Sequence, residues 1–185
     1  MKILCAGKTT GLCNLEEALT QRGFKVIVVP ETATELISSG ICPWELATNE
    51  FQTLLIERQI NKEETTRKAV KFLNRDVVIF YDRGLLDNKA YMSYKLFKKI
   101  LAEKNLAEVQ ARDRYDAVFH LVTAADGAEE YYTLSNNAAR KETPEEARRL
   151  DRITRNSWVG HPHLRVIDNS TNFEQKMDRL LKESS

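Results

Sequence analysis

Short apolar segments alternate with longer amphipathic ones along this chain. Four apolar runs, at 24–29, 76–81, 117–122 and 164–167, have the length and continuous apolar character of strands covered on both faces. Between them, apolar residues at helical spacing predict seven helices, at 9–22, 32–38, 49–72, 87–104, 106–114, 143–157 and 172–183. An apolar stub at residues 1–4 predicts one further, short strand.

This alternation predicts an α/β fold built on a parallel sheet with helices on both faces. The four prolines are scattered, at positions 30, 43, 144 and 162, and no repeat, linker or break in composition divides the chain. We therefore expect a single domain over residues 1–185. In such sheets ligands bind beyond the carboxyl ends of the strands, so the residues that follow each strand are the first place to look for a site.

Composition narrows the class of protein and its partners. Of 185 residues, 42% are hydrophobic and 30% charged, which is typical of a globular protein. A net charge of +1 argues against a long nucleic acid or an anionic membrane as partner, and no apolar run approaches the roughly 20 residues of a membrane span. The start lacks the apolar core of a secretory signal, and three cysteines form no C-x-x-C pair, so we expect free thiols and a cytoplasmic location.

A phosphate-binding loop is the first candidate site. Gly7-Lys8-Thr9 stands where a strand gives way to a helix, so backbone N–H groups and the lysine could surround phosphate oxygens while the threonine hydroxyl ligates Mg²⁺. The full pattern G-x-x-x-x-G-K-[ST] requires a glycine at position 2, where this chain has Lys2. A solvated helix start is the alternative interpretation of this tripeptide.

Charged residues follow the other strands as well. Glu31 comes after the second strand, Asp82-Arg83 after the third, and Asp168-Asn169-Ser170 after the last. Parallel strands end at one rim, so Asp82 could present a carboxylate to Mg²⁺ and Arg83 could hold a phosphate or an acceptor. The alternatives are a surface turn for Asp82-Arg83 and a helix-capping role for Glu31.

The 143–157 segment is rich in arginine. Thr143 and Pro144 predict its N-terminus, and Arg148, Arg152 and Arg155 share one helical face. Such a face could close over a triphosphate as a lid, or it could simply be solvated. For Tyr131-Tyr132 two interpretations are open: the pair could form the base of an acceptor pocket or pack in a loop. His161 and His163 predict a turn rather than a metal site.

Together these motifs resemble small P-loop NTPases of the AAA type. Their relatives include the nicotinamide riboside kinase domain of bifunctional NAD-biosynthesis regulators and, more distantly, deoxynucleoside and thymidylate kinases. The resemblance runs along nearly the whole chain and is carried by residues 5–10, 29–33, 51–52, 81–91, 114–116 and 167–170. It implies a three-layer sandwich with about five parallel strands and a helical, arginine-rich lid near residues 138–160.

The resemblance also implies a set of roles. Nucleotide, ATP or GTP, would be bound by Ala6, Gly7, Lys8, Thr9, Thr10, Arg155, Asp168, Asn169 and Ser170, with Mg²⁺ on Thr9 and Asp82. Catalysis would involve Lys8, Glu31 as general base or acceptor-positioning group, Asp82, Arg83, Arg148 and Arg152. Asp87 and Tyr91 would join Glu31 and Arg83 around the acceptor.

These roles describe a phosphotransferase or NTPase, in which the γ-phosphoryl group of MgATP passes to a hydroxyl of a small, nucleoside-like molecule. A nucleotide-dependent regulatory switch and a degenerate, non-catalytic nucleotide-binding protein are the alternatives. The chain departs from its relatives at the start, where only four residues precede Cys5 and no Gly-Gly-Pro-like loop is present. We therefore expect a truncated first strand and phosphate loop, and reduced nucleotide affinity.

Overall fold

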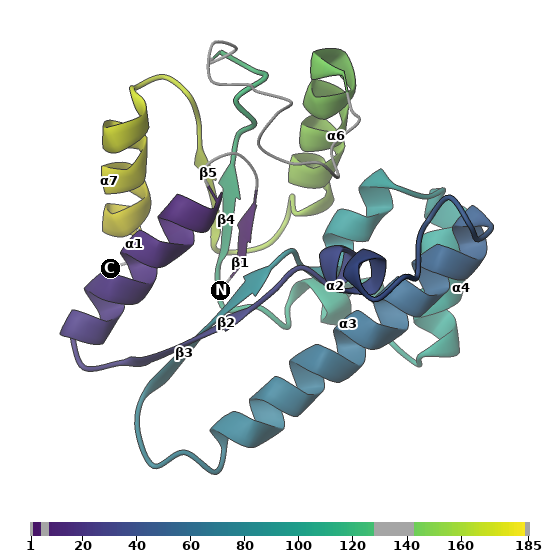
Figure 1. The fold of residues 1–185 in the computed structure, drawn as a ribbon, viewed down its shortest axis with the longest axis horizontal. Helices are drawn as coiled ribbons and strands as arrows, with labels where there is room; N and C mark the ends of the chain where they lie inside the picture. The colour runs from purple at the N-terminus through teal and green to yellow at the C-terminus, as the bar shows by residue number, and fades with distance from the viewer. Residues whose placement is uncertain (1, 5–7, 128–142, 184–185) are drawn as a thin grey trace.

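A computed structural model describes residues 2–4, 8–127 and 143–183, with only the backbone described for residues 2–4, 8 and 9. Five parallel strands form one sheet in the order β2-β3-β1-β4-β5 (Figure 1). Their bounds are β1 Lys2–Leu4, β2 Lys25–Val29, β3 Val77–Asp82, β4 Val118–Leu121 and β5 Leu164–Ile167. The predicted α/β fold with parallel strands is confirmed.

The helices cover both faces of this sheet (Figure 1). They are α1 Lys8–Gln21, α2 Thr32–Ser38, α3 Thr48–Val70, the 3₁₀-helix η1 Leu85–Ala90, α4 Tyr94–Glu103, α5 Glu108–Arg112, α6 Pro144–Ser157 and α7 Phe173–Glu183. α1 and α7 pack against Phe80 and Phe119, whereas α3 and η1 pack against Tyr81 and Val118 on the other face. Because side chains alternate along a strand, neighbouring residues of β3 and β4 belong to opposite cores.

Most predicted elements lie within two residues of their observed bounds, but the single helix predicted over 87–104 is wrong. The structure divides it into η1 and α4, and Ser93 caps the second helix by accepting a hydrogen bond from the Leu96 N–H. η1 begins early because the N–H groups of Gly84 and Leu85 donate to the side chains of Asp87 and Tyr115. Those acceptors are buried, and one of them is distant in sequence.

In the described part of the chain, β1 comprises three residues, Lys2–Leu4. β1 pairs with β3 through Lys2 and Ile3 only, and with β4 through its three residues. Among the described residues, the first four positions of β3 therefore pair only on the β2 side. β1 lies in the middle of the sheet, between β3 and β4.

Two absences concern only the described part of the chain. No helix there has the length and apolar character needed to cross a membrane. Cys13 and Cys42 are free thiols, and Cys13 is exposed rather than packed in the core.

Burial in the core between α1 and α7 predicts a large difference between two leucine truncations. Leu15 is 0% exposed, whereas Leu54 on α3 is 42% exposed. Leu15→Ala should lower the free energy of unfolding by about 2–5 kcal/mol because it leaves a cavity. Leu54→Ala, the matched control, should change it by less than about 1 kcal/mol. Urea unfolding followed by circular dichroism measures both, and equal losses would contradict this assignment of the core.

Candidate functional site

Glu31 and Arg83 meet at the carboxyl ends of β2 and β3. The strand register pairs Val29 with Tyr81, which places the two charged residues at the same level. Arg83 Nε donates to Glu31 Oε1 over 3.2 Å, and the Thr34 hydroxyl donates to Glu31 Oε2 over 2.9 Å. Glu31 occupies the N-cap position of α2 but makes no capping hydrogen bond there. Its carboxylate is thus held between α2 and the turn after β3.

Asp82 ends β3 beside the strand that leads to α1. Its backbone partner on β1 is Ile3, and β1 ends one residue later, at Leu4. The predicted phosphate-loop residues Cys5, Ala6 and Gly7 lie outside the described residues, while Thr10 is exposed in the first turn of α1. The half-buried Asp82 therefore lies on the strand next to β1, and β1 precedes the 14-residue helix α1 in the sequence.

Arg83 is one of two non-glycine residues in the described chain with a positive φ, at 78°. Side chains hold both ends of the peptide group that follows it. Its carbonyl accepts from Gln59 Nε2 over 3.3 Å, and the N–H of Gly84 donates to Asp87 Oδ2 over 2.8 Å. Residues in this backbone region cost about 1–3 kcal/mol and persist only where their surroundings hold them. The orientation of Arg83 toward Glu31 therefore depends on buried groups behind the turn.

Those buried groups centre on Glu63 of α3, which is 1% exposed. Tyr115 Oη donates to Glu63 Oε1 over 2.7 Å and accepts from the Leu85 N–H over 2.9 Å. Arg67 Nη2 donates to Oε2 over 3.1 Å, and Arg114 forms an ion pair with the same oxygen at 3.1 Å. Burial raises the pKa of Glu63, and Arg114, Tyr115, Arg67 and Gln59 oppose that rise.

This cluster was not among the predicted site residues. The available signal was the set of polar side chains at positions 52, 59 and 63, which interrupt the apolar face of the long helix at helical spacing. Gln52 is also buried, and its Oε1 has no hydrogen-bond partner in the described structure. An amide oxygen in this state is an acceptor awaiting a donor.

The structure places Asp87 in the core and not on the surface of an acceptor pocket. It is 2% exposed, and besides Gly84 its carboxylate accepts from Trp158 Nε1 over 2.7 Å. Tyr91, the other residue expected around an acceptor, is exposed. Of the four residues expected there, Glu31 and Arg83 are in direct contact and Asp87 bonds to the turn that follows Arg83.

The arginine-bearing helix α6 is fixed to the end of β4 through Asp151. Asp151 Oδ1 accepts from the Thr123 N–H over 3.0 Å, and Oδ2 lies 3.1 Å from Nε2 of the buried His120. Because a carboxylate only accepts, Nε2 of His120 carries the proton. His120 is thus a packed core histidine.

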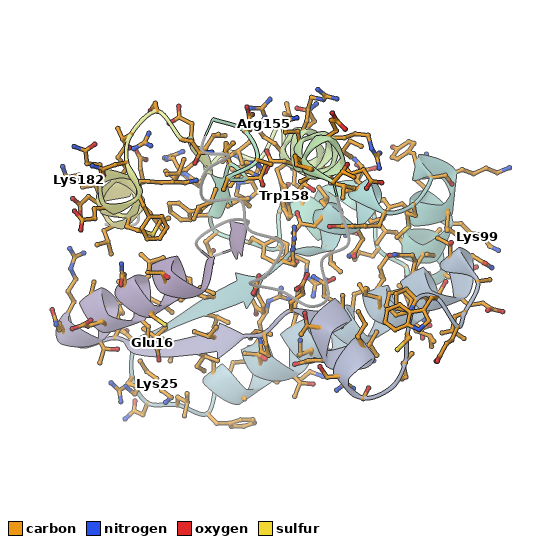
Figure 2. All side chains as sticks on the ribbon, turned by 45° about the horizontal axis from the view of Figure 1, so that its top comes forward. Glu16, Lys25, Lys99, Arg155, Trp158 and Lys182 are labelled. Atoms are coloured by element: carbon orange, nitrogen blue, oxygen red, sulfur yellow. The ribbon has the colours of Figure 1, made fainter. Side chains whose placement is uncertain are left out.

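The predicted arginine face divides into two parts. Arg148 Nη1 donates to the Ala125 carbonyl over 2.6 Å, whereas Arg152 and Arg155 are exposed. Figure 2 shows Arg155 beside α6 at the rim and Trp158 further inside. Tyr131, Tyr132 and the start of the predicted lid lie outside the described residues. His161 and His163 form a turn, in which the His163 N–H donates to His161 Nδ1.

The predicted adenine-side residues join the ends of β4 and β5. Asn169 Nδ2 donates to the carbonyls of Thr123 and Asp126 over 2.8 and 2.6 Å. The buried Lys176 of α7 donates to Asn169 Oδ1 and to the Val122 carbonyl. This loop is therefore held in place mainly by contacts to backbone carbonyls.

Asp168 is bound within the same loop. Its Oδ1 accepts from the Ser170 hydroxyl over 2.6 Å, the Ser170 N–H over 3.2 Å and Arg179 Nη1 over 2.7 Å. These contacts, the Ser170 hydroxyl first, lower the pKa of Asp168 to about 2. The carboxylate stays charged across the whole neutral range.

Comparison with known proteins identifies a family for this chain. The profile of the AAA_28 family, described as an AAA domain, matches residues 4–176. The chain belongs to this AAA family. No curated protein matches it. The family is of the P-loop NTPase type, so the match identifies this AAA domain as a P-loop nucleotide-binding protein.

The donor set of the AAA domain fits Mg²⁺. Mg²⁺ prefers oxygen ligands and is usually held by one or two protein groups together with nucleotide phosphates. Asp82, at the end of β3, is a residue with a carboxylate, and Thr9, the second residue of α1, is one with a hydroxyl, although its side chain lies outside the described part of the structure. Within the described ranges no cluster of three or more His, Cys, Asp or Glu side chains forms a self-sufficient metal site.

The low pKa of Asp168 provides a test of the adenine-side loop. Its stabilising contribution should be present above pH 3.8, the ordinary value, and should be lost as pH falls through about 2. Ser170→Ala should raise the pKa of Asp168 toward 3.8, and Arg179→Ala should raise it less, because the Ser170 hydroxyl lowers it most. NMR titration of the Asp168 carboxyl carbon measures this, with the exposed Asp178 as control. An unchanged pKa in both variants would contradict the observed contacts.

Proposed function

We propose that this AAA domain is a small-molecule kinase. It binds MgATP at the start of α1 and transfers the γ-phosphoryl group to a hydroxyl of a nucleoside-like acceptor. The observation that carries the proposal is the contact between Glu31 and Arg83 at 3.2 Å, one strand away from the approach to α1. A carboxylate and a guanidinium at this rim supply the two charges that phosphoryl transfer to a hydroxyl needs besides the phosphate loop.

On the nucleotide side, residues 6–10 bind the β- and γ-phosphates, with Lys8 as the neutralising cation. Thr9 and Asp82 would hold Mg²⁺, which would offset the negative charge of the phosphates. Asp168, Asn169 and Ser170 border the adenine ring. Arg152 and Arg155 are exposed on α6 and can turn toward the phosphates, while Arg148 supports the loop after β4.

On the acceptor side, Glu31 orients the attacking hydroxyl and accepts its proton. The acceptor oxygen then forms a bond to the γ-phosphorus, the bond from that phosphorus to the bridging oxygen breaks, and ADP leaves. Arg83 is positioned to move from Glu31 to the transferred phosphoryl group and to neutralise its charge. Catalysis of this kind consists of positioning and charge stabilisation.

The buried Gln52 is an argument for an acceptor that carries N–H groups. It lies two helical turns, about 10 Å, before Gln59 on the same buried face of α3, and Gln59 contacts the Arg83 carbonyl. The buried amide oxygen of Gln52 has no donor in the described structure, and a base or amide group of an acceptor would supply one.

Two substitutions separate binding from chemistry. Lys8→Ala should abolish the thermal stabilisation that MgATP or MgGTP gives the wild-type protein, because ligand binding to the native state raises stability by mass action. Glu31→Gln should keep that stabilisation and reduce ADP release with an accepted nucleoside by about 10²–10⁴-fold, the usual contribution of a general base.

Glu45→Gln, at an exposed position before α3, is the matched control and should behave as wild type. If Glu31→Gln turns over at the wild-type rate, the base assignment is wrong. Binding without any acceptor-dependent turnover across a panel of nucleosides would favour a nucleotide-dependent switch. A wild-type protein that no nucleotide stabilises would refute the proposal.

A further inference from the structure

We propose that Asp87 is a positioning residue that couples α6 to Arg83. This inference rests on the proposed function and concerns the coupling between the nucleotide side and the acceptor side of the site. The carboxylate of Asp87 accepts from the Gly84 N–H through Oδ2, over 2.8 Å, and from Trp158 Nε1 through Oδ1, over 2.7 Å. The two donors belong to the turn after β3 and to the end of α6, and Trp158 is 71 residues from Asp87 in the sequence.

On the side of the turn, Asp87 determines where Arg83 points. The peptide group between Arg83 and Gly84 is fixed at its N–H by Asp87 and at its carbonyl by Gln59. Rotation of this peptide changes ψ of Arg83, whose φ of 78° already depends on external support. Any displacement of the Asp87 carboxylate therefore changes the distance between Arg83 and Glu31.

On the side of α6, the indole of Trp158 moves with the helix. Trp158 is 0% exposed and is the C-cap residue of α6. Its ring makes edge contacts with Tyr115, at a centroid distance of 5.3 Å, and with His161, at 6.2 Å. Arg155 lies three residues before it, less than one helical turn. A shift of Arg155 toward a bound triphosphate therefore acts on Trp158 and, through it, on Asp87.

The chemistry of this link requires a carboxylate. Both partners of Asp87 are N–H donors, and a carboxylate accepts at both oxygens, whereas an asparagine would turn its own N–H₂ group toward one of them. Coupling between two sites is reciprocal, so nucleotide at α6 would order the turn at Arg83, and an ordered turn would favour nucleotide.

The chain has two tryptophans, which gives a matched pair of variants. Trp158→Phe removes the indole donor and keeps an aromatic ring in the core. Trp44→Phe makes the same change at a position that is 69% exposed, and leaves Trp158 as the sole tryptophan. MgATP is the probe, read by amide hydrogen exchange and by tryptophan emission.

Without nucleotide, Trp158→Phe should speed exchange at residues 82–86 about tenfold relative to residues 118–121 of β4, while Trp44→Phe leaves both unchanged. With MgATP, wild type and Trp44→Phe should gain protection at residues 82–86, and Trp158→Phe should lose most of that gain with a Kd for MgATP within about threefold of wild type. A merely structural role would raise exchange equally at both segments.

Emission gives an independent measurement that does not need Trp158→Phe to fold. In Trp44→Phe, MgATP should change the emission of Trp158, and adding Asp87→Asn should remove most of that change. Equal protection at residues 82–86 in wild type and Trp158→Phe, with and without MgATP, would overturn the coupling while leaving the kinase proposal intact. If MgATP fails to bind wild type, the kinase proposal fails, and exchange without nucleotide still decides whether Trp158 supports the turn.

Discussion

The left-handed backbone of Arg83 is the constraint around which the site is built. An arginine gains nothing from this conformation by itself, so the surrounding groups must hold it there. Gln59 and Asp87 hold the following peptide, and Tyr115 holds the next N–H group. All three are buried, where an unpaired polar group costs about 1–3 kcal/mol, so any rearrangement of the turn would leave several groups unsatisfied at once.

Glu63 extends the same constraint to the charges behind the turn. Removing one partner of a buried ion pair costs far more than replacing the whole pair with apolar groups, so such clusters favour one arrangement more than they add stability. Glu63 faces Arg67 and Arg114 while Tyr115 links it to the backbone of η1. The cluster therefore fixes α3 against the turn. This agrees with a role in selecting one conformation of the turn rather than in raising the free energy of unfolding.

Local patterns in the sequence account for the elements and for one half of the rim. Apolar runs predict the strands, Thr143 and Pro144 predict the start of α6, and the rule that parallel strands end together predicts that Glu31 and Arg83 are neighbours. The prediction of a single helix over 87–104 failed because Asp87 bonds back to Gly84 and also to Trp158, which is 71 residues away. Glu63 was missed for the same reason, since its partner Tyr115 is 52 residues away. No local window contains such contacts.

The rim has two halves, the carboxyl ends of β2 and β3 and those of β4 and β5, and the short strand β1 lies between them. The β2 and β3 side is organised by Arg83 and its supports, and the β4 and β5 side by Asn169 and Lys176. Among the described residues, three positions of β1 pair between these two sides. α6 contacts both halves, since Asp151 bonds to Thr123 after β4 and Trp158 bonds to Asp87 after β3. α6 therefore links the strands on either side of β1. The spacing between the two sides of the site depends on α6 as well as on the sheet.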